Sequence, residues 1–116
     1  MTIERIDIGP RMSQAVIHGN TVYLAGQVAS DASGKSVTEQ TKNILDRIDA
    51  LLVKAGTDKT KILTTTIWLA DMSTFAEMNA VWEAWIPAGH TPARATVESK
   101  LADPKWKVEI MLIAAI

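Results

Sequence analysis

Two stretches of the chain repeat apolar residues at steps of three and four, the spacing of an amphipathic helix. The first follows a Ser-x-x-Glu capping box at residues 36–39 and is expected to end at Gly56. Its apolar positions are Ile44, Leu45, Ile48, Leu51 and Leu52. The second helix is expected to begin at Asp71 or Ser73, either of which can cap it, and to end before Pro87. Its apolar positions are Phe75, Met78, Val81, Trp82 and Trp85.

The remaining apolar segments predict strands. Residues 14–25 are expected to form a β-hairpin, because Gly19-Asn20 separates two β-prone runs and supplies the positive-φ residues of a tight turn. Further strands are expected near 3–8 and over 62–69, 93–100 and 106–115. Strand pairs segregated from two helices predict an α+β fold, in which one sheet carries both helices on a single face.

The opposite face of such a sheet has no third helix to cover it. Apolar side chains nevertheless occur on the expected strands at Tyr23, Trp68, Met111 and Ile113. Association through this face is the simplest way to remove them from water, so the pattern predicts a homo-oligomer.

Composition narrows the class of protein. The 116 residues include 12 basic and 13 acidic side chains, a formal net charge of −1, 47% hydrophobic residues and no cysteine. This length and apolar content suit one domain over residues 1–116 that closes its core without disulfides. Nucleic-acid binders usually carry a basic patch, and a membrane span needs about 20 apolar residues. We therefore expect a cytoplasmic protein without nucleic-acid or membrane partners.

Several common catalytic motifs do not fit. His18 and His90 belong to no nucleophile motif and lack the spacing of a metal site, so no metal is expected. Gly34-Lys35-Ser36 imitates the end of a phosphate-binding loop, but the required earlier glycine is replaced by Ala29. No nucleotide cofactor is expected either.

Two charged residues in otherwise apolar strands are more informative. Glu109 is the single carboxylate in the run from Val108 to Ile116, and a buried carboxylate needs a partner, an open cleft or a raised pKa. Arg94 follows Pro92 at the mouth of a strand, where a guanidinium can bind a ligand carboxylate through two parallel hydrogen bonds. The alternative interpretation is structural: Arg94 pairs with Glu109 or with Glu98 on neighbouring strand positions.

Five segments, in register along almost the whole chain, resemble the RidA (YjgF) family of enamine/imine deaminases. They are Ala25-Gly26-Gln27-Val28, Gln40-Thr41, Phe75-x-x-x-Asn79-x-x-Trp82, Pro92-Ala93-Arg94 and Val108-Glu109-Ile110. The opening Met1-Thr2-Ile3, with Ala88-Gly89-His90 and Lys107-Val108-Glu109-Ile110, is closest to the YoaB-like branch.

The resemblance implies a chorismate-mutase-like α+β fold with a mixed sheet, assembled as a homotrimer with clefts between subunits. It implies a hydrolase of the 2-iminobutanoate/2-iminopropanoate deaminase kind, which converts imino and enamino acids to 2-keto acids and ammonia without a cofactor. By the family's pattern, Arg94 grips the substrate carboxylate, Glu109 places the hydrolytic water, and Gly26 forms the cleft wall. Asn79 matches a helical asparagine that is expected to be structural.

The chain departs from the family pattern at two positions. The pocket tyrosine after the early Gly-Pro is replaced by Arg11 and Met12, so Met12 is expected to line the pocket. The cysteine two positions beyond the arginine is replaced by Thr96, whose hydroxyl or backbone is expected to contact the carbinolamine. The alternative function is a trimer that binds a small carboxylate metabolite without turnover, as a sensor or regulator. That function needs Arg94 but not Glu109.

Overall fold

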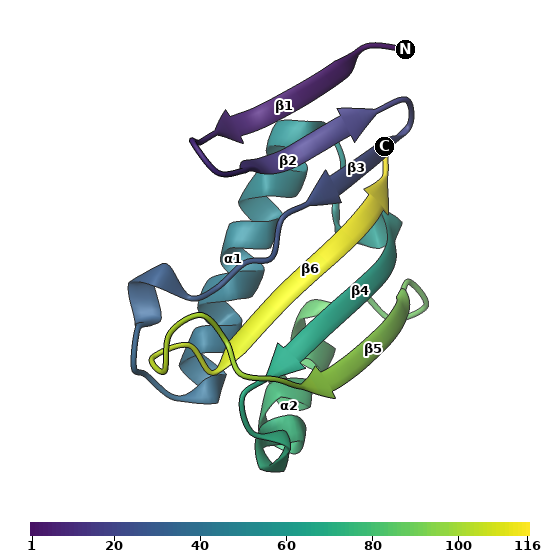
Figure 1. Ribbon diagram of the computed structural model, residues 1–116. Helices are drawn as coiled ribbons and strands as arrows, with labels where there is room; N and C mark the ends of the chain where they lie inside the picture. Colours follow the sequence, from purple (N-terminus) through teal and green to yellow (C-terminus); the bar gives the residue numbers. More distant parts are fainter.

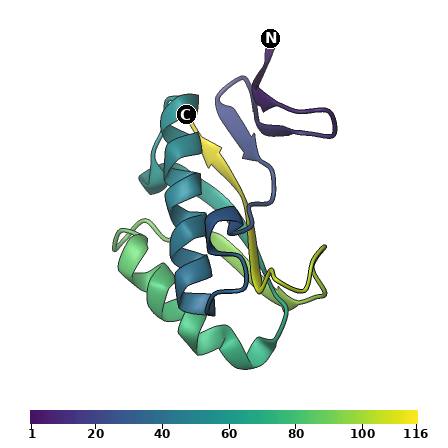
Figure 2. The same ribbon diagram turned by 90° about the vertical axis from the view of Figure 1, so that its left-hand side faces the viewer.

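Six strands form one mixed sheet, and both α-helices cover the same face of it, as the sequence predicts (Figures 1 and 2). The computed structural model describes all residues from 1 to 116. The strands are β1 (Ile3–Ile8), β2 (Ser13–His18), β3 (Thr21–Leu24), β4 (Ile62–Leu69), β5 (Ala93–Glu98) and β6 (Val108–Ala115), and the helices are α1 (Val37–Ala55) and α2 (Phe75–Trp85). The sheet order is β1-β2-β3-β6-β4-β5, and β4 with β5 is the parallel pair.

Helix α1 begins and ends where the sequence predicts. The Ser36 hydroxyl accepts a hydrogen bond from the Glu39 N–H at 3.1 Å, and the Glu39 carboxylate accepts the Ser36 N–H at 3.3 Å, so the capping box is formed. At the other end Gly56 adopts a left-handed conformation with a φ of 83°. The apolar positions of the helix, Ile44 and Ile48 among them, are buried against the sheet.

Helix α2 begins later than predicted. Asp71 does act as a cap, accepting the Ser73 N–H at 2.9 Å, but the residues that follow it form a 3₁₀ turn (Met72–Thr74). The α-helix itself starts at Phe75. Neither α1 nor α2 combines the length and the apolar character that a bilayer crossing requires.

The hairpin between β2 and β3 forms, with one correction to its turn. Gly19 has a φ of 61°, but Asn20 has no positive φ, so the prediction that both turn residues adopt one was wrong. A positive φ at the first central position alone fits a type II′ turn.

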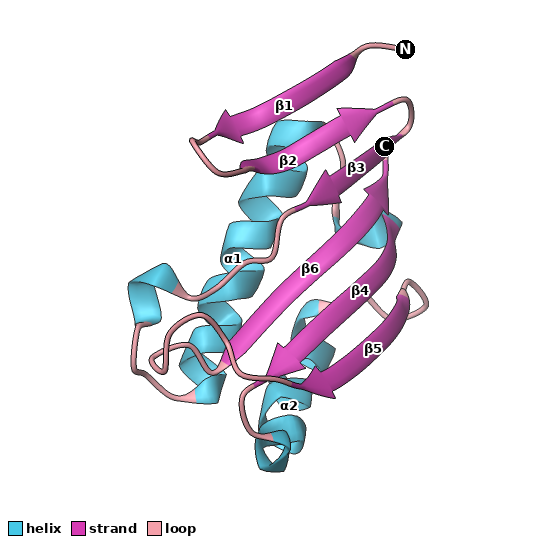
Figure 3. Ribbon diagram, viewed as in Figure 1, coloured by secondary structure: helices cyan, strands magenta, loops and turns pink.

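Strands β5 and β6 are shorter than the predicted 93–100 and 106–115, and a long loop joins them (Figure 3). The Lys107 N–H donates to Gln40 Oε1 at 2.9 Å, and Gln40 Nε2 donates to the Lys105 carbonyl at 2.8 Å. A buried side chain of α1 therefore holds the end of this loop, where the sequence pattern predicts a strand.

The two faces of the sheet differ along β6. Val108, Ile110 and Leu112 point toward the helices and are almost fully buried. The alternate residues Glu109, Met111 and Ile113 point to the face that no helix covers. On this face Tyr23 and Met111 expose 44% and 37% of their surface, so the predicted uncovered apolar face is present.

Removing the helix cap tests the role of the capping box. Ser36→Ala deletes the acceptor of the Glu39 N–H and should lower the free energy of unfolding by about 1 kcal/mol in urea denaturation. Ser33→Ala, at an exposed serine of the preceding loop, is the control and should change stability much less. Equal losses in the two variants would contradict a stabilising cap.

Candidate active site

Arg94 lies on β5, at the edge of the sheet, and its side chain points to the helical face. The guanidinium carbon is 5.9 Å from the centre of the Phe75 ring and 5.5 Å from that of Trp82, within the range of cation–π attraction. Burial lowers the pKa of Arg94, partly offset by Glu83, yet an arginine stays charged at any physiological pH. Two aromatic rings of α2, those of Phe75 and Trp82, thus stabilise the charge of Arg94.

No carboxylate pairs with this arginine. The ion pair of the structure joins Lys54 Nζ to Asp7 Oδ2 at 2.9 Å, and Glu98 instead accepts the Met72 N–H at 2.9 Å. The alternative that Arg94 forms a structural pair with Glu109 or Glu98 was therefore wrong. The planar donors of the guanidinium remain available to a ligand anion.

Glu109 lies on the other face of the sheet and packs against Gly26. A methyl group added at Gly26 would collide with Oε2 of Glu109 and lie 3.0 Å from its Cδ. Glu109 is half-buried, and burial alone raises the pKa of its carboxyl above the ordinary value of 4.5. Of the three alternatives expected for this carboxylate (a partner, an open cleft or a raised pKa), the structure favours a raised pKa, caused by desolvation and not by a charged partner.

The register of the strands separates the two candidate groups. Arg94 is paired with Thr65, and Thr65 with Leu112, whose side chains face the helices. Glu109 is paired with Trp68 on the opposite face. One chain therefore does not bring Arg94 and Glu109 into a common cleft.

Thr96 shares the face of Arg94, and its buried hydroxyl has no hydrogen-bond partner. The neighbouring Thr65 hydroxyl is likewise buried without one. Met12 lies in the turn between β1 and β2 and is 53% exposed. Because the Gln14 carbonyl accepts the Ala25 N–H at 2.9 Å, this turn lies close to the segment that carries Gly26.

The sequence pattern did not predict the contact of Arg94 with the rings of Phe75 and Trp82. The helical spacing of α2 placed both Phe75 and Trp82 in its apolar stripe, and Trp82 is indeed buried. Phe75, at the start of the same stripe, is 40% exposed and lies outside the core. Periodicity along one helix carries no signal for a cation on a distant strand.

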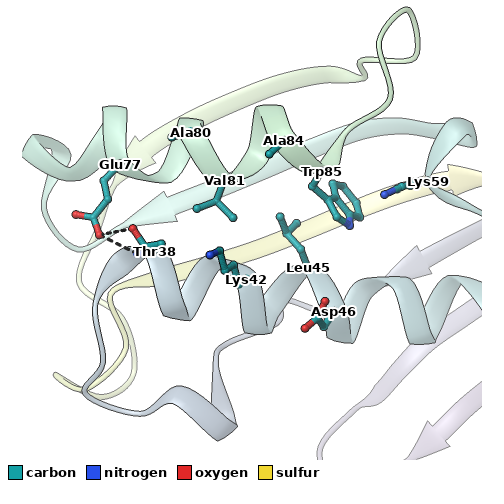
Figure 4. Close-up of a pocket in the computed structure, with 10 residues that line it drawn as sticks. All are labelled: Thr38, Lys42, Leu45, Asp46, Lys59, Glu77, Ala80, Val81, Ala84 and Trp85. Carbon is teal, nitrogen blue, oxygen red and sulfur yellow. Dashed lines mark hydrogen bonds between the residues drawn. The ribbon is translucent and has the colours of Figure 1, made fainter.

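A groove of about 540 Å³ lies between α1 and α2 (Figure 4). It is on the helical side of the sheet, whereas Glu109 points to the opposite face. Its charged lining includes Lys42 and Lys59 but also Asp46 and Glu77. Glu77 is already engaged, since it accepts the N–H and the hydroxyl of Thr38 at 2.8 and 2.9 Å. The groove thus has mixed charge and contains none of the predicted site residues.

Comparison with known proteins identifies the family. The model of the Ribonuc_L-PSP family, described as endoribonuclease L-PSP, matches residues 2–116. The chain belongs to this family. The L-PSP relative YoaB of Escherichia coli, a RutC family protein, is 49% identical over 116 residues, which is 100% of both chains. A YjgF family structure from Neisseria meningitidis has a TM-score of 0.95 and 43% identity, covering 99% of this chain and 95% of that chain.

A more distant L-PSP relative carries an enzyme name. The goat protein called 2-iminobutanoate/2-iminopropanoate deaminase is 37% identical over 112 residues, covering 92% of this chain and 80% of its own length. The predicted resemblance to the RidA (YjgF) family and to its YoaB-like branch is therefore confirmed. The roles of individual site residues stay predictions.

A double-mutant cycle tests the contact between Gly26 and Glu109. Gly26→Ala should lower the free energy of unfolding by about 1 kcal/mol, because the added methyl forces the end of the Glu109 side chain to move. In a Glu109→Ala background the same change should cost much less, giving a coupling of up to about 1 kcal/mol in urea denaturation. Additive effects would show that the two residues are not in contact.

Proposed function

We propose that this chain hydrolyses 2-imino and 2-enamino acids to 2-keto acids and ammonia, at clefts between the subunits of a homotrimer. The observation that carries the proposal is the environment of Arg94, which is half-buried, lies against two aromatic rings and forms no ion pair. Such a group fits the carboxylate of a small acid. The goat relative named as an imine deaminase supports the choice of substrate class.

The reaction follows from the two charged groups. Arg94 binds the substrate carboxylate through two parallel hydrogen bonds and thereby orients the C=N bond. Glu109 orients a water molecule and accepts its proton as the oxygen adds to the carbon of the protonated imine, which gives a neutral carbinolamine. Glu109 then returns this proton to the amino nitrogen, and ammonia leaves as the hydroxyl gives its proton to the carboxylate and becomes the keto group; the carboxyl finally loses this proton to solvent. The raised pKa of Glu109 makes it a better proton acceptor than an ordinary carboxylate.

A second copy of the chain supplies what one copy lacks. Arg94 and Glu109 lie on opposite faces, and β5 is an edge strand. A neighbour that covers the apolar face around Tyr23 and Met111 can set its β5 edge near Gly26 and Glu109. Each cleft then combines Glu109 and Gly26 of one subunit with Arg94 and Thr96 of the partner subunit. Thr96, two positions beyond Arg94 on the same face, is the proposed contact of the carbinolamine through its hydroxyl or its backbone.

The choice of an imine over RNA rests on charge. The family description names a ribonuclease, but this chain has a formal net charge of −1. Binding to a phosphate backbone is driven by clustered lysine and arginine. We therefore propose no nucleic-acid partner.

A coupled assay tests the reaction. An amino-acid oxidase generates 2-imino acids, and the protein should accelerate their decay. Arg94→Ala and Glu109→Gln should each lower kcat/KM by about 100-fold or more, because one loses the carboxylate anchor and the other the proton acceptor. Arg5→Ala, at an exposed arginine on the opposite edge strand, is the control.

The same variants separate the enzyme from a metabolite-binding trimer. A protein that only binds a metabolite would bind a 2-keto acid without accelerating imine decay. Arg94→Ala would abolish this binding and Glu109→Gln would keep it. That set of results would overturn the proposed hydrolase and favour the metabolite-binding trimer.

Subunit mixing tests the composite cleft. Arg94→Ala and Glu109→Gln chains, inactive alone, should regain part of the wild-type activity when they are co-expressed, because some clefts then receive both intact residues. Co-expression of two differently tagged Arg94→Ala chains is the control and should stay inactive. Mixed assemblies that form but remain inactive would contradict a cleft shared between subunits.

A further inference from the structure

Gln27 directly follows Gly26 and is only 2% exposed. Both hydrogens of its side-chain amide and the amide oxygen have hydrogen-bond partners. Nε2 donates to Gln14 Oε1 at 2.9 Å and to the Ala25 carbonyl at 3.0 Å. Oε1 accepts Nε of Arg47, on α1, at 3.4 Å. One buried amide therefore ties the end of β3 to β2 and to α1.

The backbone of Gln27 is fixed beside Glu109. Its N–H donates to the Ile110 carbonyl at 2.8 Å, and the Ile110 N–H donates to its carbonyl at 3.1 Å. This isolated bridge lies beyond Leu24, where strand β3 has already ended. Gly26 precedes Gln27 in the sequence, and Glu109 precedes Ile110. The bridge therefore lies next to the contact between Gly26 and Glu109.

The segment has few other restraints. Ala25 donates its N–H to Gln14, and regular β3–β6 pairing extends only to Tyr23. A pocket of about 180 Å³ adjoins Gln27 on the side of α1, lined by polar groups that include Gln14, Arg47 and Lys54. Without the amide network, water can enter from this pocket, and the backbone bridge to Ile110 is left as the main restraint that keeps Gly26 against Glu109.

We propose that Gln27 is a positioning residue for Glu109. Its amide network holds Gly26 in place, and Gly26 in turn packs against the Glu109 carboxylate. The inference rests on the proposed imine hydrolysis and extends it to a residue that does not touch the substrate. Arg47 belongs to the same hydrogen-bond network, because it reaches Glu109 only through its bond to the Gln27 amide. Carboxylate binding by Arg94 lies outside this network.

Gln27→Leu tests the proposal against Thr57→Val as control. Thr57 is a buried residue whose hydroxyl bonds the Ala115 carbonyl at 2.6 Å, at the far end of β6, so its loss reports on stability alone. Gln27→Leu should lower kcat by about 10- to 100-fold with KM nearly unchanged. The pKa of the Glu109 carboxyl, followed by ¹³C NMR, should move down toward its ordinary value as water reaches it.

Arg47→Met is the second variant, in case Gln27→Leu does not fold. It removes one bond to the Gln27 amide without contacting Gly26 or Glu109, and it should move kcat and the Glu109 pKa in the same direction by a smaller amount. A wild-type kcat and Glu109 pKa in Arg47→Met, or changes in Gln27→Leu no larger than in Thr57→Val, would overturn the positioning role.

The NMR titration keeps the two proposals distinguishable. If wild-type protein hydrolyses no imine, the proposed function fails. The dependence of the Glu109 pKa on Gln27 and Arg47 would still decide whether the amide network positions the carboxylate.

Discussion

The alternation of side chains along β6 is the constraint on which the core and the candidate chemistry both depend. Val108 and Ile110 point into the core and are fully buried, whereas Glu109 between them points to the opposite face. A register shift of one residue would bury the carboxylate in the core and move an isoleucine to its place. The packing of the helices on the sheet thus fixes the face on which Glu109 lies.

Arg94 shows a second way in which the fold handles a charge. The guanidinium is partly desolvated and has no carboxylate partner, and the rings of Phe75 and Trp82 offset part of that cost. The aromatic rings accept no hydrogen bonds from the N–H groups in the plane of the Arg94 guanidinium. These donors therefore remain available to an incoming anion. A structural ion pair would have used the same donors and removed that capacity.

Because these two groups lie on opposite faces, the proposed catalysis depends on the proposed assembly. The uncovered face carries apolar side chains such as Tyr23 and Met111, and burying them favours association. Under the proposed arrangement the same association brings Arg94 of the partner subunit to Glu109. The Gln27 network acts at a different level, since it holds Gly26 against Glu109 within one chain.

Local sequence patterns are enough to predict the secondary-structure elements. The capping box at Ser36, the C-cap at Gly56 and the alternation along β6 act over a few residues, so the order of elements and the α+β class could be predicted from them. The family was predicted from the resemblance of five short segments. Which groups come into contact depends on the tertiary structure. It excluded the Arg94–Glu109 pair, exposed Phe75 beside Arg94 and made Gln27 a junction of three elements. These contacts join residues far apart in the chain, and their geometry depends on strand register and helix packing, which no local pattern encodes.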